Sequence, residues 1–257
     1  MTLQDERSLE PHPALRPLVH EVRTLVVMPG SRRVMTKLPN PTASLVLCLS
    51  RDGETKLLAV GPGTHASYKR VTAVPFYTRV ALRPGAARGY FGVPLHELVD
   101  RVAPIRSLWG RRGETLEEEL ASLTGDPPAM LLALERELLH RLQHHDETAA
   151  RRRLLGRAVA ALDANPARGE PIAELARMLR VSERYLRQLF REEIGISPKH
   201  YARIARIRRV VSQMGAGRLA RLATDHGFYD QAHLTSEFRD LLRVTPRAFL
   251  AGELPVH

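Results

Sequence analysis

The sequence predicts an α+β protein of two domains, a β-rich N-terminal domain followed by an all-α C-terminal domain. Apolar runs bounded by glycine and proline fill the first half, and from residue 151 onward apolar residues recur at helical spacing. A short helical unit also occurs twice in the second half. The chain has 257 residues, enough for two cores, and we place the domains at 1–145 and 151–257.

Short runs rich in β-forming residues make up the first domain. Their alternation of apolar and polar residues is imperfect, which predicts strands that are partly covered on both faces. Glycine and proline fall at the ends of the runs, as is typical of a compact barrel or sandwich. The runs are "TLVVMPG" (24–30), "SLVLCLS" (44–50), "KLLAVGPG" (56–63) and "RVALRPG" (79–85).

Helices are expected to follow these strands within the first domain. "TLEEELASL" (115–123) is one, and "PPAMLLALERELLHRL" (127–142) is a second with apolar residues at helical spacing. Asp126 is the expected N-cap of the second helix, with prolines in its first turn. Two roles are open for the apolar face of this helix: it packs on its own strands, or it pairs with a second copy of the chain.

The polar segment 143–153 contains the expected domain boundary, and the residues after it predict only helices. Five are short and one is a longer connector, which indicates an all-α domain. The expected helices are 151–163, 171–179, 183–193, 199–214, 219–226 and 231–242.

The positive charge is concentrated in the second domain. Residues 151–257 hold 20 Lys and Arg against 11 Asp and Glu, whereas residues 1–150 hold 19 against 17. Such an excess indicates a polyanionic partner, although charge alone does not separate DNA from RNA or an anionic membrane. No apolar run is long enough for a membrane span and the start has no secretory h-region, so we expect a cytoplasmic protein without membrane contact.

An internal repeat is the strongest signal in the sequence. Residues 172–201 align with residues 219–249, and each unit reads as a helix, a tight turn and a second helix. The offset is 47 in the first helix and 48 in the second, because one residue is inserted. The matched pairs are Leu175 and Leu222, Ala176 and Ala223, Val181 and Phe228, Leu186 and Leu234, Phe190 and Phe238, Pro198 and Pro246, and Tyr201 and Phe249.

Each repeat is therefore predicted to be a helix-turn-helix. The small alanine lets the two helices approach, and the leucine and phenylalanine at i and i+4 fill the angle between them. Two such units joined by a long helix fit recognition helices in successive major-groove segments on one face of B-DNA.

These residues resemble the AraC family of bacterial transcription regulators. The likeness covers about 160–250 through "ELA...LRVSERYLRQLFREEIGISPKHY" and "LATDHGFYDQAHLTSEFRDLLRVTP", although Arg243 stands where the family usually has glycine. Residues 11–140 more weakly resemble sensor-like regions of one AraC-type subgroup, through "RVALRPGAARGYFGVPLHEL" and "IRSLWG". The resemblance implies a cupin-like N-terminal domain that binds a small molecule or dimerises.

The expected base contacts lie on the second helix of each unit. The resemblance places Arg184, Arg187 and Gln188 on the reading positions of the first unit, where arginine suits guanine and glutamine suits adenine. The corresponding outward positions of the second unit include Gln231, Thr235 and Ser236, with no arginine. We therefore expect the first unit to carry most of the direct readout.

Further basic residues are candidates for contacts with DNA phosphates, with a merely solvated role as the alternative. They are Arg191, Lys199, Arg203, Arg218, Arg239 and Arg247.

No metal, cofactor or catalytic site is expected. His140 and His144 share a helix face, with His145 beside them, but they lack the intervening glutamate of a zinc protease. One cysteine cannot form a thiolate cluster.

The leading hypothesis is a sequence-specific DNA-binding regulator that is not an enzyme. Its partners are double-stranded DNA and, as candidates, RNA polymerase, a small effector and a second copy of the chain. The rivals are a low-specificity nucleoid-type binder and a cupin-like enzyme fused to a DNA-binding domain.

Overall fold

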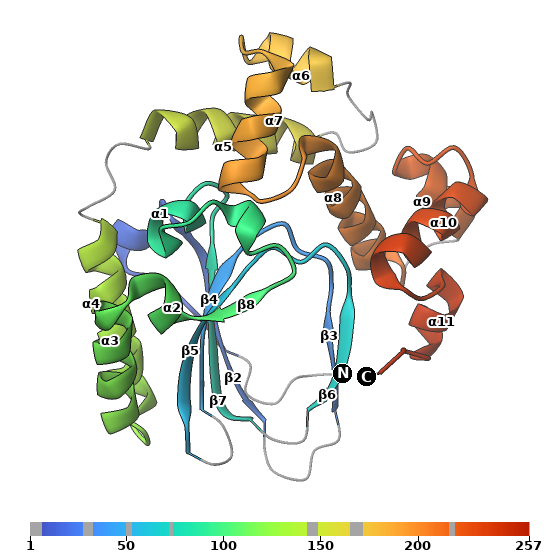
Figure 1. Ribbon diagram of the computed structural model, residues 1–257. Coiled ribbons are helices and arrows are strands. Elements are labelled where there is room, and N and C mark those ends of the chain that lie inside the picture. The colour runs from blue at the N-terminus through green and yellow to red at the C-terminus, as the bar shows by residue number, and fades with distance from the viewer. Residues whose placement is uncertain are drawn as a thin grey trace.

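The computed structural model describes residues 7–27, 33–49, 53–71, 74–142, 149–164, 172–215 and 219–256. We call residues 7–142 the N-terminal region and residues 149–256 the C-terminal region. The described strands all lie in the N-terminal region (Figure 1). They are β1 (Arg7–Leu9), β2 (Val19–Val27), β3 (Arg33–Lys37), β4 (Ser44–Leu49), β5 (Thr55–Val60), β6 (Ser67–Val71), β7 (Val74–Leu82) and β8 (Val102–Pro104).

The strands form two antiparallel sheets. The larger has the order β1-β2-β7-β4-β5-β8, and the smaller pairs β3 with β6. At its centre Leu45 of β4 lies opposite Ala59 of β5 and Val80 of β7, and all three side chains are buried. Consecutive residues of β4 from Ser44 to Leu47 are buried, which confirms that a strand with an unbroken apolar run is covered on both faces.

Helices cover one face of the larger sheet (Figure 1). Apolar residues of α3 and α4 share one buried cluster with β4, β5 and β7, so the amphipathic face of α4 packs on its own strands. Asp126 accepts a hydrogen bond from the backbone N–H of Ala129 at 3.1 Å, as expected of the N-cap. The helices are η1 (Pro13–Leu15), α1 (Ala87–Phe91), η2 (Leu95–Glu97), α2 (Ile105–Trp109), α3 (Arg111–Ser122) and α4 (Pro127–Leu142).

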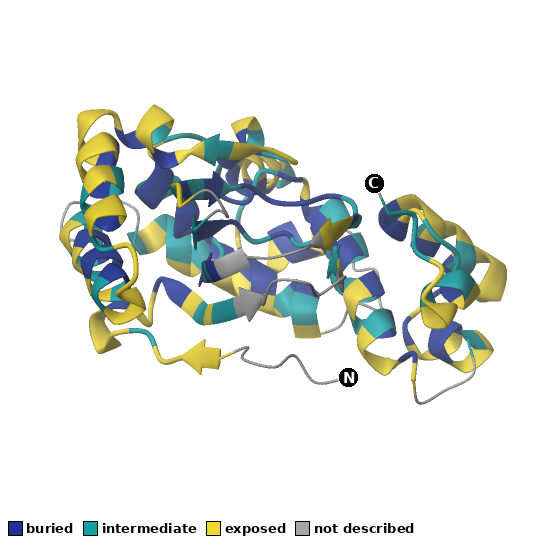
Figure 2. Ribbon diagram, turned by 90° about the horizontal axis from the view of Figure 1, so that it is seen from below, coloured by how far each residue is buried: buried dark blue, intermediate teal, exposed yellow. Residues whose placement is uncertain are grey.

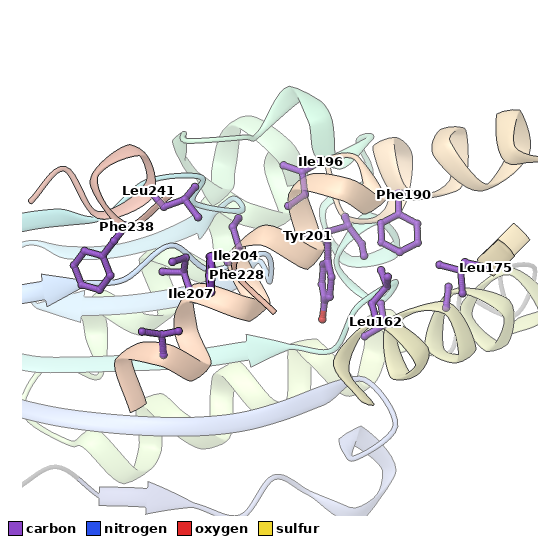
Figure 3. Close-up of a cluster of buried hydrophobic side chains, with 14 of the residues drawn as sticks. Leu162, Leu175, Phe190, Ile196, Tyr201, Ile204, Ile207, Phe228, Phe238 and Leu241 are labelled. Atoms are coloured by element: carbon purple, nitrogen blue, oxygen red, sulfur yellow. The ribbon is translucent and has the colours of Figure 1, made fainter. Parts of the chain in front are cut away.

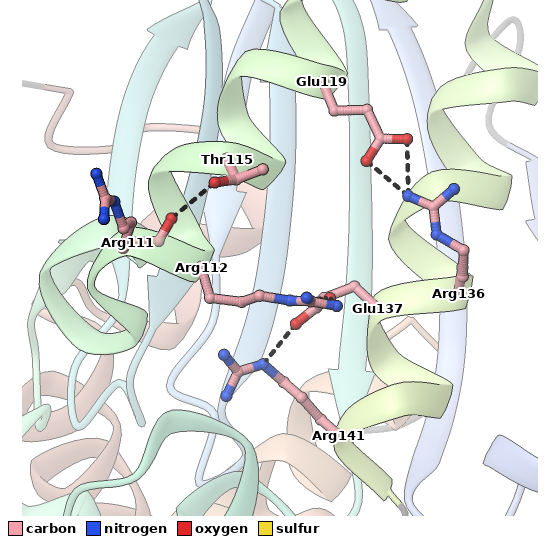
Figure 4. Close-up of polar contacts among 7 residues, drawn as sticks. All are labelled: Arg111, Arg112, Thr115, Glu119, Arg136, Glu137 and Arg141. Atoms are coloured by element: carbon pink, nitrogen blue, oxygen red, sulfur yellow. Dashed lines mark hydrogen bonds and ion pairs between the residues drawn. The ribbon is translucent and has the colours of Figure 1, made fainter.

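Ion pairs join α3 to α4 beside this core (Figure 4). Glu137 is buried, and its carboxylate accepts hydrogen bonds from Arg112 at 2.8 Å and from Arg141 at 3.0 Å. Two cations thus compensate one buried anion, which would otherwise carry a large desolvation cost. Arg136 and Glu119 form a second pair nearer the surface, at 2.6 Å.

The C-terminal region is helical throughout its described residues. In Figure 1 it lies above the sheets and along the edge formed by β3 and β6. Its helices are α5 (Ala149–Ala164), α6 (Ile172–Met178), α7 (Glu183–Glu193), α8 (Pro198–Gln213), α9 (Leu219–Asp225), α10 (Gln231–Leu242) and α11 (Pro246–Ala251).

One apolar core runs through all of these helices (Figure 3). Ile204 and Ile207 of the connector α8 lie between Phe190 of the first unit and Phe238 of the second. The cluster also includes Tyr68 of β6, so the core of the C-terminal region reaches into the N-terminal region.

The predicted fold is confirmed, with a β-rich sheet region and trailing helices followed by an all-α region of two helix-turn-helix units. Strands β2, β4, β5 and β7 contain or overlap the four predicted runs. The helices 183–193 and 231–242 have the predicted bounds, whereas α11 and the short strands β1, β3, β6 and β8 were not predicted. The expected boundary falls largely on residues 143–148, outside the described residues, and the cupin-like character of the sheets stays a prediction.

Helices at the edge of the molecule have one buried and one exposed face (Figure 2). Among the described helices, none has the length and apolar character needed to cross a membrane.

Candidate nucleic-acid interface

The second helix of the first unit, α7, begins at a strong N-cap. The Ser182 hydroxyl accepts a hydrogen bond from the backbone N–H of Tyr185 at 3.1 Å, which satisfies one of the free amides at the helix start. Leu186, Leu189 and Phe190 are fully buried and anchor the inner face of the helix. The outer face is therefore fixed in orientation.

The predicted reading residues lie on this outer face. Arg184, Arg187 and Gln188 are exposed. The guanidinium of Arg187 pairs with the Glu183 carboxylate at 2.6 Å, one helical turn earlier. Arg184 forms no ion pair within the described part of the chain.

Gln188 is tied to the end of its own helix. Its amide nitrogen donates to Oε1 of Glu192 at 2.8 Å. This hydrogen bond, with those from Arg151 and the charge of Arg88, lowers the pKa of the Glu192 carboxyl. Because a carboxylate only accepts, the bond orients the amide: Nε2 faces Glu192, and Oε1 and one N–H stay available to a base.

The second unit presents α10 in the same manner. Asp230 accepts from the backbone N–H of His233 at 2.7 Å, and Leu234 and Phe238 are fully buried. The outward residues border a shallow hollow of about 510 Å³. Its lining residues are Gln231, Ala232, Thr235, Ser236 and Arg239.

The chemistry of this hollow differs from that of α7. The Thr235 hydroxyl donates to the backbone carbonyl of Gln231 at 2.8 Å, so its proton is already used within the helix. Gln231 and Ser236 are exposed, and the cation at the hollow is Arg239, one turn beyond Ser236. The hollow thus offers few groups that distinguish one base from another.

The repeat seen in the sequence is also a repeat of geometry. Phe190 meets Tyr201 edge to face at 5.9 Å between ring centroids, and Phe238 meets Phe249 in the same way at 5.6 Å. The hydroxyls of Ser197 and Thr245 cap α8 and α11 at equivalent positions. Both units therefore hold their second helix by the same ring contact and the same type of capped turn.

The candidate phosphate contacts fall into three groups. Arg191, Lys199, Arg239 and Arg247 are exposed, and Lys199 and Arg247 occupy equivalent positions in the first turns of α8 and α11. Arg203 instead donates from Nε to Glu237 at 2.8 Å and from Nη2 to Asp240 at 2.5 Å, so it joins α8 to α10 and its charge is already paired. Arg218 lies outside the described residues.

Tyr229 is a further candidate for the interface that the sequence did not identify. It is 93% exposed and directly precedes the N-cap of α10. The alignment of the two repeats could have indicated it, because the one residue that the second repeat has in addition to the first falls at this turn. An exposed aromatic ring beside a recognition helix can pack on sugars and donate from its hydroxyl to a phosphate.

The histidines considered in the sequence do not assemble with other ligands. In the part of the chain that the structure describes, no three His, Cys, Asp or Glu side chains lie close enough to hold one metal ion. His140 lies near the end of α4, and His144 and His145 fall outside the described residues.

Two domain families match the chain. A helix-turn-helix domain family matches residues 175–252, and a domain of unknown function (DUF6597) matches residues 7–104. No curated protein matches significantly.

Several solved structures are similar to the chain. A transcriptional regulator with an AraC-type DNA-binding domain from Chromobacterium violaceum is 25% identical, with coverage of 42% of this chain and 97% of that one and a TM-score of 0.38. The C-terminal domain of AraT from Geobacillus stearothermophilus is 19% identical, with coverage of 39% and 86% and a TM-score of 0.37. ToxT from Vibrio cholerae O395 is 10% identical, with coverage of 90% and 97% and a TM-score of 0.43.

The family match spans both repeated units, from the first helix of the first unit to the end of α11. The capped and anchored helices α7 and α10, with exposed basic and polar faces, have the geometry that such a domain needs to enter a major groove. Residues 175–252 therefore form an AraC-type helix-turn-helix domain, and the chain is a DNA-binding transcription regulator.

Proposed function

We propose that this regulator reads sequence mainly through α7, with α10 positioning the protein in the adjacent major-groove segment. The observation that carries the proposal is the difference between the two outer faces. Arg184, Arg187 and Gln188 are exposed on α7, whereas the outward residues 231, 232, 235 and 236 of α10 include no cation. Arginine can bond guanine at two acceptors, and glutamine can bond adenine in the same way.

The side-chain contacts on α7 support this division of roles. The Gln188 amide is already oriented by Glu192, so less rotamer entropy is lost when it meets a base. The ion pair from Arg187 to Glu183 is exposed and therefore weak, so it competes little with a charge-assisted bond to guanine. On α10, contacts of Ala232 with a thymine methyl and sensitivity to DNA shape would supply only a modest preference.

The positions of four exposed cations in the helix-turn-helix units support their proposed contacts with DNA phosphates. Lys199 and Arg247 occupy equivalent first turns, and Arg191 and Arg239 lie one turn beyond the reading positions of their helices. Side chains placed in this way can fix the register of the protein on the duplex without reading bases.

We also propose that the N-terminal region binds a small apolar effector. A hollow of about 260 Å³ lies between β2, β7 and α4, where Leu15, Val80 and Leu134 form part of an aliphatic lining. This volume suits a small molecule rather than a peptide. Adding small apolar compounds to the full chain should raise its melting temperature, and Leu134→Trp, which fills the hollow, should abolish that rise.

The outer face of α10 has few groups that distinguish bases, and this favours one alternative function, a DNA binder with little sequence preference. The two functions differ in the ratio of affinities for a selected site and for random DNA. A regulator should bind its selected site at least about 1000-fold more tightly, whereas a nucleoid-type binder shows a ratio near one with an equally steep salt dependence.

The experiment that tests the proposal compares Arg187→Ala with Thr235→Ala on the best site selected from random duplexes. The arginine variant should lower the specificity ratio by about 5- to 100-fold, and the threonine variant by less than about threefold. Arg153→Ala, at an exposed position of α5, is the matched control and should leave the ratio unchanged. Equal losses at positions 187 and 235 would reject the asymmetry.

A further inference from the structure

The C-terminal ends of both recognition helices are held by the N-terminal region. At the end of α7, Nη1 of Arg88 from α1 lies 3.0 Å from Oε2 of Glu192 and 2.9 Å from Oε1 of Glu193. At the end of α10, the backbone N–H of Ala66 donates to the Leu241 carbonyl at 2.8 Å. One helix is thus held through its side chains and the other through its backbone.

The contact at α7 is electrostatically demanding. Two carboxylates at a helix C-terminus face the negative end of the helix dipole, and the side chain of Glu193 is only 2% exposed. A buried carboxylate needs a close cation, because the cost of leaving it unpaired is large. Arg88 supplies that charge from the N-terminal region, and Arg151 of α5 supplies it from the C-terminal region at 3.3 Å.

The contact at α10 satisfies carbonyls that have no partner within the helix. The last carbonyls of any helix lack intrahelical donors. Ala66 serves Leu241, and the Tyr68 hydroxyl donates to the carbonyl of Leu242 at 2.7 Å in a buried position. Burial raises the pKa of Tyr68 to about 12, so the hydroxyl keeps its proton at neutral pH.

A third contact leaves no room between the two regions. Gly195, in the turn after α7, has φ of 95°, and a Cβ at this position would lie 2.7 Å from the Leu95 carbonyl oxygen of η2. Backbone therefore packs directly on backbone. Together with the contacts of Arg88 and Tyr68, this close approach fixes α7 and α10 on one rigid support.

The support leaves the reading faces uncovered. Arg184 and Arg187 on α7 and Gln231 and Ser236 on α10 are exposed while the C-terminal ends of their helices are held. Docking on the N-terminal region therefore does not bury the residues proposed to meet DNA.

We propose that the N-terminal region is a brace that sets the placement of α7 relative to α10, with Arg88 and Tyr68 as positioning residues. The brace fixes the distance and rotation between the two half-sites that the protein accepts. This inference rests on the proposed function, in which both helices meet adjacent major-groove segments.

The consequence appears in the spacing of the DNA site. One inserted base pair moves the half-sites apart by about 3.4 Å and turns one against the other by about 35°, because a helical turn of 34–36 Å holds 10–10.5 base pairs. If the brace holds α7 and α10 at a fixed separation and rotation, the two helices cannot both keep their base contacts on the altered site. A protein whose two units are joined only through α8 can follow it by local bending.

The test uses the full chain and its best site from random duplexes, with one base pair inserted or deleted between the half-sites. Wild-type protein should lose at least about tenfold in affinity on each altered site, as for loss of one good set of base contacts. The double variant Arg88→Met with Tyr68→Phe should lose no more than about threefold. Arg136→Met and Tyr90→Phe make the same chemical changes within the N-terminal region and should retain the wild-type discrimination.

Arg151→Met separates bracing from local charge compensation. It removes the other cation from Glu192 and Glu193 without touching the link between regions, so it should also keep the wild-type spacing discrimination. If it relaxes the spacing discrimination as much as the double variant does, the effect is local and the brace is wrong. Unfolding in urea verifies that each variant is folded, and if the double variant is unfolded, Arg88→Lys and Tyr68→Phe are each tested alone and should relax spacing partly.

Two further outcomes would overturn the brace. Unchanged discrimination in the double variant would show that Arg88 and Tyr68 do not set the spacing. Tighter binding of the double variant to the parent site would show that these contacts restrain the reader. The proposed function fails in a different way, through a wild-type chain that selects no preferred site.

Discussion

At the scale of single residues, the two repeats require a left-handed backbone at the same places. Arg180 and Gly227 have φ of 58° and 68° in the turn between the two helices of each unit. Gly195 and Arg243 have φ of 95° and 57° in the turn after each recognition helix. Each unit thus has one glycine and one arginine in these turns, with the order exchanged between units.

Arg243→Gly should therefore stabilise the protein. The left-handed conformation is costly for a residue with a Cβ, and glycine adopts it without that penalty. Glycine also raises the conformational entropy of the unfolded chain, which offsets part of the gain. The free energy of unfolding should therefore rise by about 0.5 to 1 kcal/mol. Urea unfolding measures this change in free energy, and the dependence of that free energy on urea concentration should stay unchanged. Arg157→Gly, in the interior of α5, should instead destabilise by about 1 kcal/mol. A loss of stability in Arg243→Gly would contradict the strained turn.

A buried histidine gives the second prediction at this scale. Burial lowers the pKa of His226, whose Nε2 lies 3.0 Å from Oε1 of Gln213. The folded state therefore disfavours the protonated ring: its contribution to stability is complete above the unfolded pKa of about 6.5 and decreases as the pH falls below it. His226→Gln should flatten the fall in melting temperature between pH 7.5 and 5.5. Exposed His20→Gln should keep the wild-type slope, and an identical slope in both variants would contradict this assignment.

The sequence was a good guide to residues whose contacts are local. The cap Asp126 was predicted from its position before an apolar period and is confirmed, because a cap bonds within three residues. Arg203 was proposed for phosphate, yet its partners Glu237 and Asp240 lie on another helix. No local pattern reveals such a pairing, which depends on how α8 and α10 pack.

At the scale of elements, helices with a clear apolar period were predicted within a residue or two, except α3, which begins four residues before the predicted segment 115–123. The strands that were missed are short or lie at sheet edges: β1 and β8 have three residues each and are largely exposed. Their backbone pairing, rather than an apolar alternation, defines them. Helix α11 was missed because six residues give too short a period, although Pro246 and its match Pro198 marked the start of both helices.

The turn after α7 provides a prediction at this scale. Gly195→Ala should destabilise the protein more than Gly92→Ala, although both glycines have positive φ. A Cβ at position 92 meets no atom within 4 Å and adds only backbone strain, about 1 kcal/mol. At position 195 it also collides with the backbone of Leu95. Comparison of urea midpoints measures the difference, and equal losses would show that the turn can move away from η2 at no cost.

At the scale of the whole molecule, the sequence indicated two regions but not how they meet. The contacts between them join residues about 100 to 170 positions apart, as in the pairs Arg88 with Glu193 and Tyr68 with Leu242. Arg88 lies in the segment 79–98 that carries the weaker resemblance, but nothing in that segment indicates its partners, and Tyr68 belongs to no motif. For both residues a solvated side chain was an equally good expectation. Only the packed structure places them at the ends of the recognition helices.

The salt dependence of DNA binding gives a prediction for the reader as a whole. Lys199→Ala and Arg247→Ala should each weaken binding about equally on the selected site and on random DNA, and each should reduce the slope of log affinity against log salt by about 1. Affinities at several salt concentrations measure the slope. An altered specificity ratio with an unchanged slope would assign these side chains to bases instead.

Two recognition helices of one chain are proposed to enter successive major-groove segments on one face of the duplex. A hydroxyl-radical footprint of the full chain on its selected site tests this most directly. Two protected patches should appear on one face of the duplex, with centres about 10–10.5 base pairs apart. A single patch, or continuous protection that does not depend on the sequence of the duplex, would contradict it.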